Sequence, residues 1–333
     1  TGIGRFLEGL LLAIAGTHPD WRLHVAMSKQ CALPSSLQGK VQILYLPHAS
    51  ELFWPGLARE HDIFISPYPK LPWHPLSCPA IHTVHDVLYL EHPAYRGNRL
   101  RIAAARVRLR RALKQADLTW FDSDISREAC TRLVGRPRDA RIRYPAVEEM
   151  FSPGEPVWAR DEPYFLYVGN GLPHKNLPAI LRAIEHVPAF LLCAGVRDAM
   201  ADKMKTRFPE AMEKTRLLSH VPDEELVRLY RGATALLLPS TTEGYGYPPL
   251  EAMACGTPAI VADIPVLRET MCEQATYCSP HAVEDWVGAM RQMMDPEHRR
   301  KRSRQGLEWI GARQGHDGWQ AHIRDIEQLL ERG

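Results

Sequence analysis

The sequence predicts an α/β protein with two domains, each built on a parallel sheet. Short apolar runs alternate with helical patterns along the whole chain, which is typical of βαβ units. The 333 residues suffice for two hydrophobic cores. A break rich in proline and glycine, Phe151–Pro156, divides this alternation. We therefore predict domains at residues 1–150 and 163–312, a linker at 151–162, and a C-terminal helix at 313–333 that packs back on the first domain.

The first half opens with a glycine-rich turn, Thr1–Arg5, that leads directly into an apolar helical pattern. In a doubly wound sheet such a turn follows a central strand, and no strand precedes it here. We expect either a longer natural chain, which we favour, or a domain without its first strand. Six candidate strands follow: Leu23–Met27, Val41–Leu46, Ile63–Ser66, Ala80–Val84, Leu118–Asp122 and Arg141–Tyr144.

The second half repeats the alternation with clearer boundaries. Five strands are predicted: Tyr164–Val168, Phe190–Ala194, Arg216–Ser219, Ala235–Leu238 and Ala259–Ala262. Helices are predicted at Leu177–His186, Asp223–Gly232, Pro249–Cys255 and Ala282–Met294. The pattern over Trp309–Leu330 predicts the closing helix.

Composition narrows the cellular setting. The net charge of +2 gives no overall field that would favour nucleic acid. The seven cysteines are dispersed without a C-x-x-C pair, a usage typical of reduced cytosolic proteins. No apolar run approaches the roughly 20 residues of a membrane span. We expect a cytoplasmic protein.

One helical stretch is strongly basic. Arg96 to Lys114 contains eight basic residues and no acidic one, with apolar residues at Leu100, Ala103, Ala104, Val107 and Leu113. Two interpretations remain open: a helix that lies on an anionic membrane surface, or a solvated helix with one buried side. Nucleic acid is disfavoured because no aromatic residues interleave with the charges.

Three loops that follow strands contain the residues best placed for chemistry, since ligands bind at the carboxyl ends of parallel strands. His85 and Asp86 end one strand. Gly169–Leu177 is a glycine-rich loop with Lys175 at the start of a helix, where the cation and the helix dipole favour an anion such as a diphosphate. Glu243–Gly256 holds two carboxylates eight positions apart, Glu243 and Glu251.

A structural interpretation of Glu251 also exists. If Pro249 begins the helix, Glu251 falls in its first turn, where the helix dipole alone favours a carboxylate. A capping-box contact is disfavoured, because Pro248 at the N-cap has no N–H to donate.

Together these residues resemble the retaining nucleotide-sugar glycosyltransferases of the GT-B fold, family 4. The E-x7-E pattern with the E-G-[FY]-G-x-P core is present as Glu243–Glu251, and G-N-x-x-P-H-K-N-L as Gly169–Leu177. The G-I-G-R turn at Gly2–Arg5 and the pair His85-Asp86 are further matches. The resemblance implies two Rossmann-like domains that face a cleft.

The resemblance also implies roles. His85, Lys175 and Glu243 would be catalytic, with Lys175 on the diphosphate. Glu251 would bind the ribose. The remaining donor-binding residues would be Gly2, Gly4, Asn170, Gly244, Tyr245, Gly246 and Tyr247. No metal and no cofactor are expected besides the donor. One departure is Asn170, where many relatives carry an arginine that would help to stabilise the leaving group.

The function implied is a retaining, metal-independent hexosyltransferase of surface polysaccharide assembly, such as lipopolysaccharide biosynthesis. It would act on a saccharide or lipid-linked acceptor, with GDP-mannose as the first expected donor. The first domain would bind the acceptor. Peripheral contact with the inner face of the cytoplasmic membrane would involve Arg96–Lys114. The alternatives are a nucleotide-sugar epimerase or synthase on the same fold, and a catalytically degenerate binding homologue.

Overall fold

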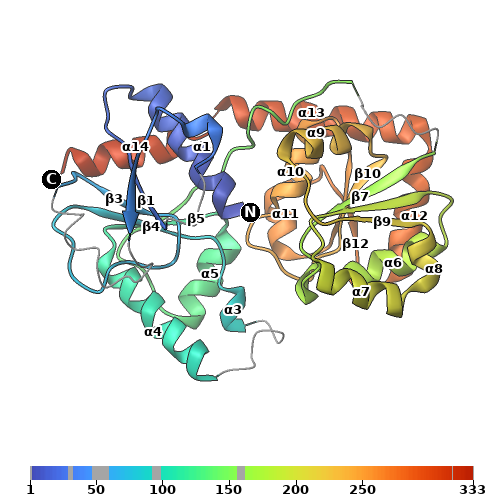
Figure 1. Cartoon of the computed structure of the whole chain (residues 1–333), viewed down its shortest axis with the longest axis horizontal. Coiled ribbons are helices and arrows are strands. Elements are labelled where there is room, and N and C mark those ends of the chain that lie inside the picture. The colour runs from blue at the N-terminus through green and yellow to red at the C-terminus, as the bar shows by residue number, and fades with distance from the viewer. Residues whose placement is uncertain are drawn as a thin grey trace. The chain divides into compact units, whose positions relative to one another are not determined.

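The computed structural model describes residues 2–28, 33–46, 60–91, 99–155, 162–316 and 318–332 (Figure 1). The chain forms two compact units. Unit 1 comprises residues 1–91, 95–146 and 317–333, and unit 2 comprises residues 92–94 and 147–316. Of the predicted linker, residues 156–161 lie outside the described residues. Phe151 is buried, with its ring centroid 5.9 Å from that of Tyr230 in unit 2.

Unit 2 contains one six-stranded parallel sheet with the order β12-β11-β10-β7-β8-β9. Its strands are β7 (Tyr164–Val168), β8 (Phe190–Ala194), β9 (Thr215–Leu218), β10 (Ala235–Leu238), β11 (Ala259–Ala262) and β12 (Thr276–Cys278). All five predicted strands are present. The prediction missed β12, because its three residues are partly polar and give no apolar run. The chain reverses its direction across the sheet between β9 and β10, so β7 and β10 are neighbours.

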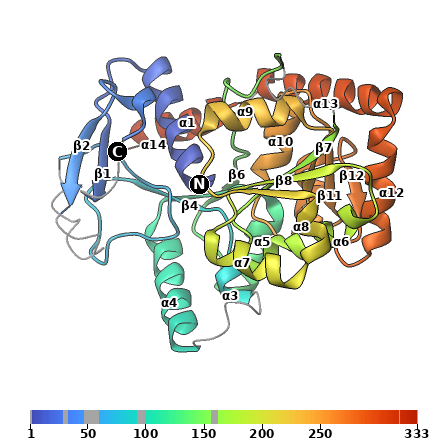
Figure 2. The same cartoon turned by 45° about the vertical axis from the view of Figure 1, so that its right-hand side comes forward.

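Helices flank this sheet on both faces, as Figures 1 and 2 show. They are η4 (Pro173–Lys175), α6 (Leu177–Glu185), α7 (Asp198–Arg207), α8 (Pro209–Glu213), α9 (Asp223–Gly232), α10 (Tyr247–Ala254), α11 (Pro265–Met271), α12 (Val283–Met294) and α13 (Pro296–His316). The predicted helix Asp223–Gly232 is confirmed without change. Its three acidic residues in the first turn favour that start because they face the positive end of the helix dipole.

Unit 1 contains two parallel sheets, with the orders β1-β2 and β3-β4-β5-β6. The strands are β1 (His24–Ser28), β2 (Gln42–Leu46), β3 (Phe64–Ser66), β4 (Ala80–Val84), β5 (Leu118–Phe121) and β6 (Ala140–Ile142). The helices are α1 (Gly2–Thr17), η1 (Ser35–Leu37), α3 (Leu88–Glu91), α4 (Arg99–Gln115), α5 (Asp124–Leu133) and α14 (Gln320–Leu330). The six predicted strands are thus all present within a few residues.

The two units differ at one place in their strand order. In unit 2 the first strand, β7, lies between the second strand β8 and the fourth strand β10. The equivalent place in unit 1 falls between β1 and β3, and no strand within the described ranges pairs with both. Every residue of β4 and β5 is buried, whereas Phe64 and Ile65 of β3 are only partly buried.

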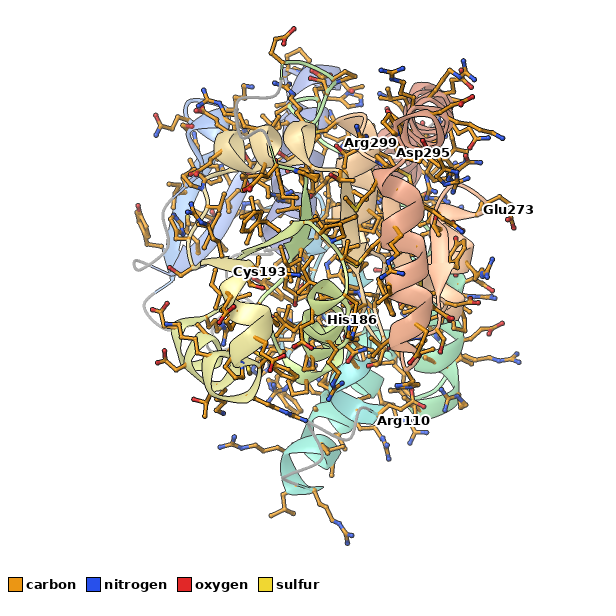
Figure 3. The ribbon with its side chains drawn as sticks, turned by 90° about the vertical axis from the view of Figure 1, so that its right-hand side faces the viewer. Arg110, His186, Cys193, Glu273, Asp295 and Arg299 are labelled. Carbon is orange, nitrogen blue, oxygen red and sulfur yellow. The ribbon has the colours of Figure 1, made fainter. Side chains whose placement is uncertain are left out.

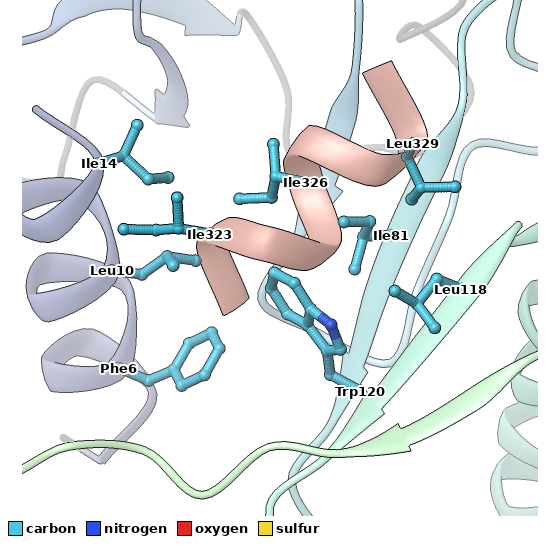
Figure 4. Close-up of a cluster of buried hydrophobic side chains, with 9 residues drawn as sticks. All are labelled: Phe6, Leu10, Ile14, Ile81, Leu118, Trp120, Ile323, Ile326 and Leu329. Atoms are coloured by element: carbon cyan, nitrogen blue, oxygen red, sulfur yellow. The ribbon is translucent and has the colours of Figure 1, made fainter. Parts of the chain in front are cut away.

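Helix α14 packs on unit 1 through an apolar cluster, as predicted for the closing helix (Figure 4). It contributes Ile323, Ile326 and Leu329, and the remainder comes from α1, β4 and β5: Phe6, Leu10, Ile14, Ile81, Leu118 and Trp120. The prediction of one closing pattern from Trp309 was wrong in extent. Residues up to His316 belong to α13 in unit 2, and Gly318 lies between the two helices with a φ of 26°.

A buried carboxylate also fixes α14. Asp325 accepts hydrogen bonds from Nε1 of Trp120 at 2.8 Å and from two nitrogens of Arg143 at 2.7 Å, and it pairs with Arg141. Burial raises the pKa of Asp325, but the hydrogen bonds and charge of Arg143, with the bonds from Trp120 and Arg141, outweigh burial and lower this pKa. Asp325 is therefore a charged contact between α14 and the sheet.

Candidate functional site

Two loops of unit 2 meet at the carboxyl edge of its sheet. Since β7 and β10 are parallel neighbours, the loops that follow them leave the sheet side by side. The amide of Thr241 donates to the carbonyl of His174 at 2.8 Å. The Asn176 amide group donates to the carbonyls of Pro239 at 3.1 Å and Pro280 at 2.8 Å. The bonds with Pro239 and Thr241 fix the lysine loop against the loop that contains the first carboxylate, and the bond to Pro280 fixes it to the segment after β12.

Lys175 and Glu243 are in direct contact. The Lys175 ammonium donates to Oε1 of Glu243 at 2.6 Å, and their side chains are only 17% and 10% exposed. The sequence predicted a cation and a carboxylate in separate roles near one ligand. The structure adds that each is the partner of the other. A diphosphate that approached the ammonium would compete with this carboxylate, because both are anions.

The entry to α10 differs from the prediction. The helix begins at Tyr247, not at Pro249, and its N-cap is Gly246 with a φ of 98°. Two prolines are tolerated in its first turn, since the first four N–H groups of a helix have no partner within the helix. A Cβ atom at Gly246 would lie 2.7 Å from Cδ2 of Leu267. Glycine at this position therefore satisfies both the backbone angle and the packing.

The tyrosines of this loop are held from two sides. Tyr245 is buried, its hydroxyl accepts from Arg313 at 3.2 Å, and its carbonyl accepts from the Thr270 hydroxyl at 3.0 Å. Its ring lies edge-on to that of Tyr247, with centroids 5.2 Å apart. The Gly244–Tyr247 segment therefore has a defined backbone path beside Glu243.

Glu251 lies in the second turn of α10, because the helix starts two residues earlier than predicted. A capping-box role is excluded, since the third helical position is Pro249. Its side chain is buried at 3% exposure, and Oε2 accepts a hydrogen bond from the Tyr230 hydroxyl at 2.7 Å. Tyr230 is a partner that sequence reasoning missed, since it lies on α9, 21 residues earlier.

Asn170 occupies the position of the expected arginine. Its Oδ1 accepts from the amide of Leu172 at 3.2 Å, which closes the glycine loop as an Asx turn. Gly171 within this turn has a φ of 71°. Asn170 thus shapes the loop that presents Lys175.

In unit 1, His85 follows β4 and is held at both ring nitrogens. Nδ1 lies 2.6 Å from Oδ2 of Asp122, and Nε2 lies 3.0 Å from the carbonyl of Pro67. Burial lowers the pKa of His85, but the charge and hydrogen bond of Asp122, with the Pro67 carbonyl, outweigh burial and raise this pKa. A protonated ring can donate to both acceptors at once. Asp122 was not among the predicted site residues, although its place at the end of β5, beside β4, is a signal that could have identified it.

Asp86 and the N-terminal glycines take places near His85. Oδ1 of Asp86 accepts from the amide of Leu88 at 3.0 Å, which opens α3. The prediction that Gly2 and Gly4 lie in a turn before the helix was wrong. Both lie within the first residues of α1. Phe6 of the same helix lies edge-on to His85, with ring centroids 4.9 Å apart. The early part of α1 therefore packs beside the histidine.

Among the described residues, no group of three or more His, Cys, Asp or Glu side chains is placed to hold a metal ion. None of the helices in the described part of the chain combines the length and apolar composition needed to cross a bilayer.

Comparison with known proteins gives a family match for unit 2. Residues 151–309, nearly all of unit 2, match the sequence profile of the family described as "Glycosyl transferases group 1". The match covers just under half of the chain, so unit 2 is similar to the group 1 glycosyl transferases. The matched region contains both loops and the Lys175–Glu243 contact.

Relatives with curated names are similar to parts of this chain. The O-antigen chain mannosyltransferase RfbU of Salmonella typhimurium is 37% identical over 134 residues, which are 39% of this chain and 38% of the relative. O-antigen chain mannosyltransferase B of Escherichia coli is 28% identical over 261 residues, 72% of this chain and 60% of the relative. The chain thus aligns with less than two thirds of the length of either relative.

Solved structures show the same GT-B fold at low sequence identity. The sucrose-phosphate synthase of Thermosynechococcus elongatus has a TM-score of 0.80 and 19% identity, covering 98% of this chain and 91% of that chain. The Anabaena protein Alr3699/HepE, solved in complex with UDP, has a TM-score of 0.74 and 15% identity, with 98% and 96% covered. The predicted α/β fold class is confirmed.

Proposed function

We propose that this chain is a retaining hexosyltransferase that moves a sugar from a nucleotide-sugar donor to a saccharide or lipid-linked acceptor. The observation that supports the proposal is the Lys175–Glu243 contact, at the point where the chain reverses direction across the sheet of unit 2. Ligands of doubly wound sheets bind at this edge. The family match covers the same residues.

The donor would bind with its diphosphate at Lys175. In the free protein Glu243 balances the charge of the ammonium, which keeps a cation in a largely buried place. When the donor binds, the ammonium turns to the diphosphate oxygens, and Glu243 becomes available for a hydroxyl of the donor sugar. The backbone of Gly244–Tyr247 lines the same loop. Glu251 binds the ribose hydroxyls, with the Tyr230 hydroxyl orienting its carboxylate.

In the reaction, the bond between the anomeric carbon and the phosphate oxygen breaks, and the acceptor oxygen bonds to the same carbon. The acceptor proton passes to the departing phosphate oxygen, so the new bond forms on the same face and the configuration is retained. Lys175 and backbone amides stabilise the charge on the leaving group, and one such donor is worth roughly 3–4 kcal/mol in a site that excludes water. No metal and no cofactor take part in this scheme.

In unit 1, a protonated His85 would supply a positive charge, and its raised pKa favours that form. Its imidazolium, held by Asp122, would donate to the donor sugar by exchanging the Pro67 carbonyl for a sugar hydroxyl. Gly2 and Gly4, at the start of α1, are proposed as further donor-binding residues, because a helix N-terminus without bulky side chains suits a phosphate.

The sugar that we propose first is mannose, from GDP-mannose. Two relatives are named O-antigen chain mannosyltransferases, which also supports an acceptor from surface polysaccharide assembly. With such an acceptor, the enzyme would act in the cytoplasm, on the inner face of the cytoplasmic membrane.

A thermal-shift screen with GDP, UDP, dTDP and ADP tests the donor first. A ligand at 100 times its Kd stabilises the protein by about 2.7 kcal/mol, so the preferred nucleotide stands out. Incubation with the matching nucleotide sugars and a saccharide acceptor then tests the reaction. Transfer with retained configuration is expected. Epimerised donor, or a disaccharide formed from a free sugar, would identify an epimerase or a synthase instead, and nucleotide binding without turnover would identify a degenerate homologue.

A further inference from the structure

Helix α4 of unit 1 has two apolar faces, and only one of them is buried. Leu109, Ala112 and Leu113 are buried within the unit, with Ile102 and Ala105 packed partly against the same core. A solvated helix with one buried side would be polar elsewhere. The sequence left open whether the apolar residues of this helix form such a buried side.

The second apolar face is exposed. Leu100 is 82% exposed and Val107 is 61% exposed, and Ala103 and Ala104 between them are also exposed. Their spacing of i, i+3, i+4 and i+7 places them in one stripe along the helix. Figure 2 shows the N-terminal end of α4, which holds this stripe, standing away from the sheets of unit 1. The residues that suggested a stripe in the sequence are therefore mostly not core residues.

Exposed basic residues flank the stripe, and no acidic residue occurs in the helix. Five are Arg99, Arg101, Arg106, Arg110 and Lys114. Figure 3 draws the side chains of α4, several of which extend outward from the helix; Arg110, which is labelled, also donates from Nε to the Val134 carbonyl at 3.0 Å. Trp73, itself 44% exposed, lies beside α4 with the Arg111 guanidinium 4.4 Å from its ring centroid. Tryptophan with arginine beside it is typical of side chains at the interface between lipid and water.

We propose that the exposed stripe of α4, which comprises Leu100, Ala103, Ala104 and Val107, docks on an anionic lipid surface. The apolar stripe enters the boundary between headgroups and acyl chains, while the flanking arginines contact the lipid phosphates. A second copy of the chain does not fit, because two such helices would bring cations against cations. The inference rests on exposure and charge in unit 1 and does not depend on the proposed transferase activity.

The test is flotation of the whole chain with vesicles of phosphatidylcholine alone, and of phosphatidylcholine with about 30 mol% phosphatidylglycerol, at about 0.1 M salt. Binding is expected only with the anionic vesicles. Leu100→Ser/Val107→Ser, which keeps every charge, is expected to reduce the partition roughly tenfold or more. Arg99→Gln/Arg106→Gln, which keeps the stripe, is expected to reduce it by a similar factor.

The matched control is Arg300→Gln/Lys301→Gln on α13, which removes the same charge from exposed positions of unit 2. This control should change the partition less than twofold, because salt screens charges that lie away from the lipid surface. Absence of binding to anionic vesicles, or equal binding of the Leu100/Val107 variant, would overturn the proposal. So would equal losses in the control, since these would indicate a response to net charge alone. Nucleotide binding, measured on each variant, shows that the protein is folded and reports separately on the donor site.

Discussion

Histidine 322 is expected to make unit 1 sensitive to acid. This side chain is fully buried on α14, among the rings of Phe6, Trp120 and Trp319, and neither ring nitrogen has a hydrogen-bond partner among the described residues. Burial, with a smaller contribution from the charge of Arg143, lowers its pKa to about 3, although the charge of Asp325 acts in the opposite direction. The residue is therefore neutral in the folded protein and has its ordinary pKa of 6.5 when unfolded.

The direction of the pH dependence follows from the number of protons that the folded and the unfolded chain bind. Below pH 6.5 the unfolded chain binds a proton at His322 that the folded chain excludes. The contribution of this residue to the free energy of unfolding is therefore complete above pH 6.5 and declines as the pH falls toward 3. For these two pKa values the loss between pH 7.5 and pH 5 is about 2 kcal/mol. His82, which is also buried and has a pKa lowered to about 3, likewise reduces the stability as the pH falls. His85 has a raised pKa and acts in the opposite direction, losing its contribution as the pH rises.

The variant His322→Phe isolates the contribution of His322 to the acid dependence of stability, because a phenyl ring keeps the aromatic packing and cannot titrate. The assay is hydrogen exchange of peptides from β4 and β5 at pH 7.5 and pH 5, corrected for intrinsic rates, which reports on unit 1 alone. The free energy of opening of the variant should fall by about 2 kcal/mol less than that of the natural chain. His74→Gln, which removes an exposed histidine from the same unit, should leave the acid dependence unchanged. An equal loss in His322→Phe and the natural chain would refute the reasoning.

Three further predictions concern unit 2. Lys175→Ala should lower kcat at least about 10²-fold, because it removes a charged contact to the leaving group and leaves Glu243 unpaired; near-normal transfer by the folded variant would remove this role. Glu251→Ala should weaken nucleotide binding in calorimetry, and unchanged affinity would return Glu251 to a structural role with the helix. Gly246→Ala should cost about 1–3 kcal/mol of stability in denaturant, given its φ of 98°. Gly288→Ala, at an open position inside α12, is the control and should be neutral or stabilising.

Much of the fold could be predicted because its strands are locally encoded. Runs such as Ala235–Leu238 and Phe190–Ala194 are apolar at every position, as a strand buried on both faces requires, and their boundaries match the structure. The short strand β12 had no such run, and the start of α10 depended on Gly246 rather than on the prolines that follow it. Where the local sequence pattern was weak, the predicted elements or their boundaries were wrong.

The candidate site was also predicted only in part from the sequence. The sequence by itself determined which residue types stand at the carboxyl ends of the strands: His85, Lys175 and Glu243. Only the tertiary structure decided their partners, because Lys175 and Glu243 are 68 positions apart and His85 and Asp122 are 37 apart. Strand order brings such residues together, and no short stretch of sequence contains it.

Helix α4 shows the physical reason most clearly. Its sequence fixes a basic helix with apolar residues on two sides, but burial depends on the elements that pack against it. Contacts with distant segments cover Leu109 and Leu113 and leave Leu100 and Val107 to the solvent. Periodicity determined that the helix forms, and the tertiary structure alone decided which of its faces is available to another surface.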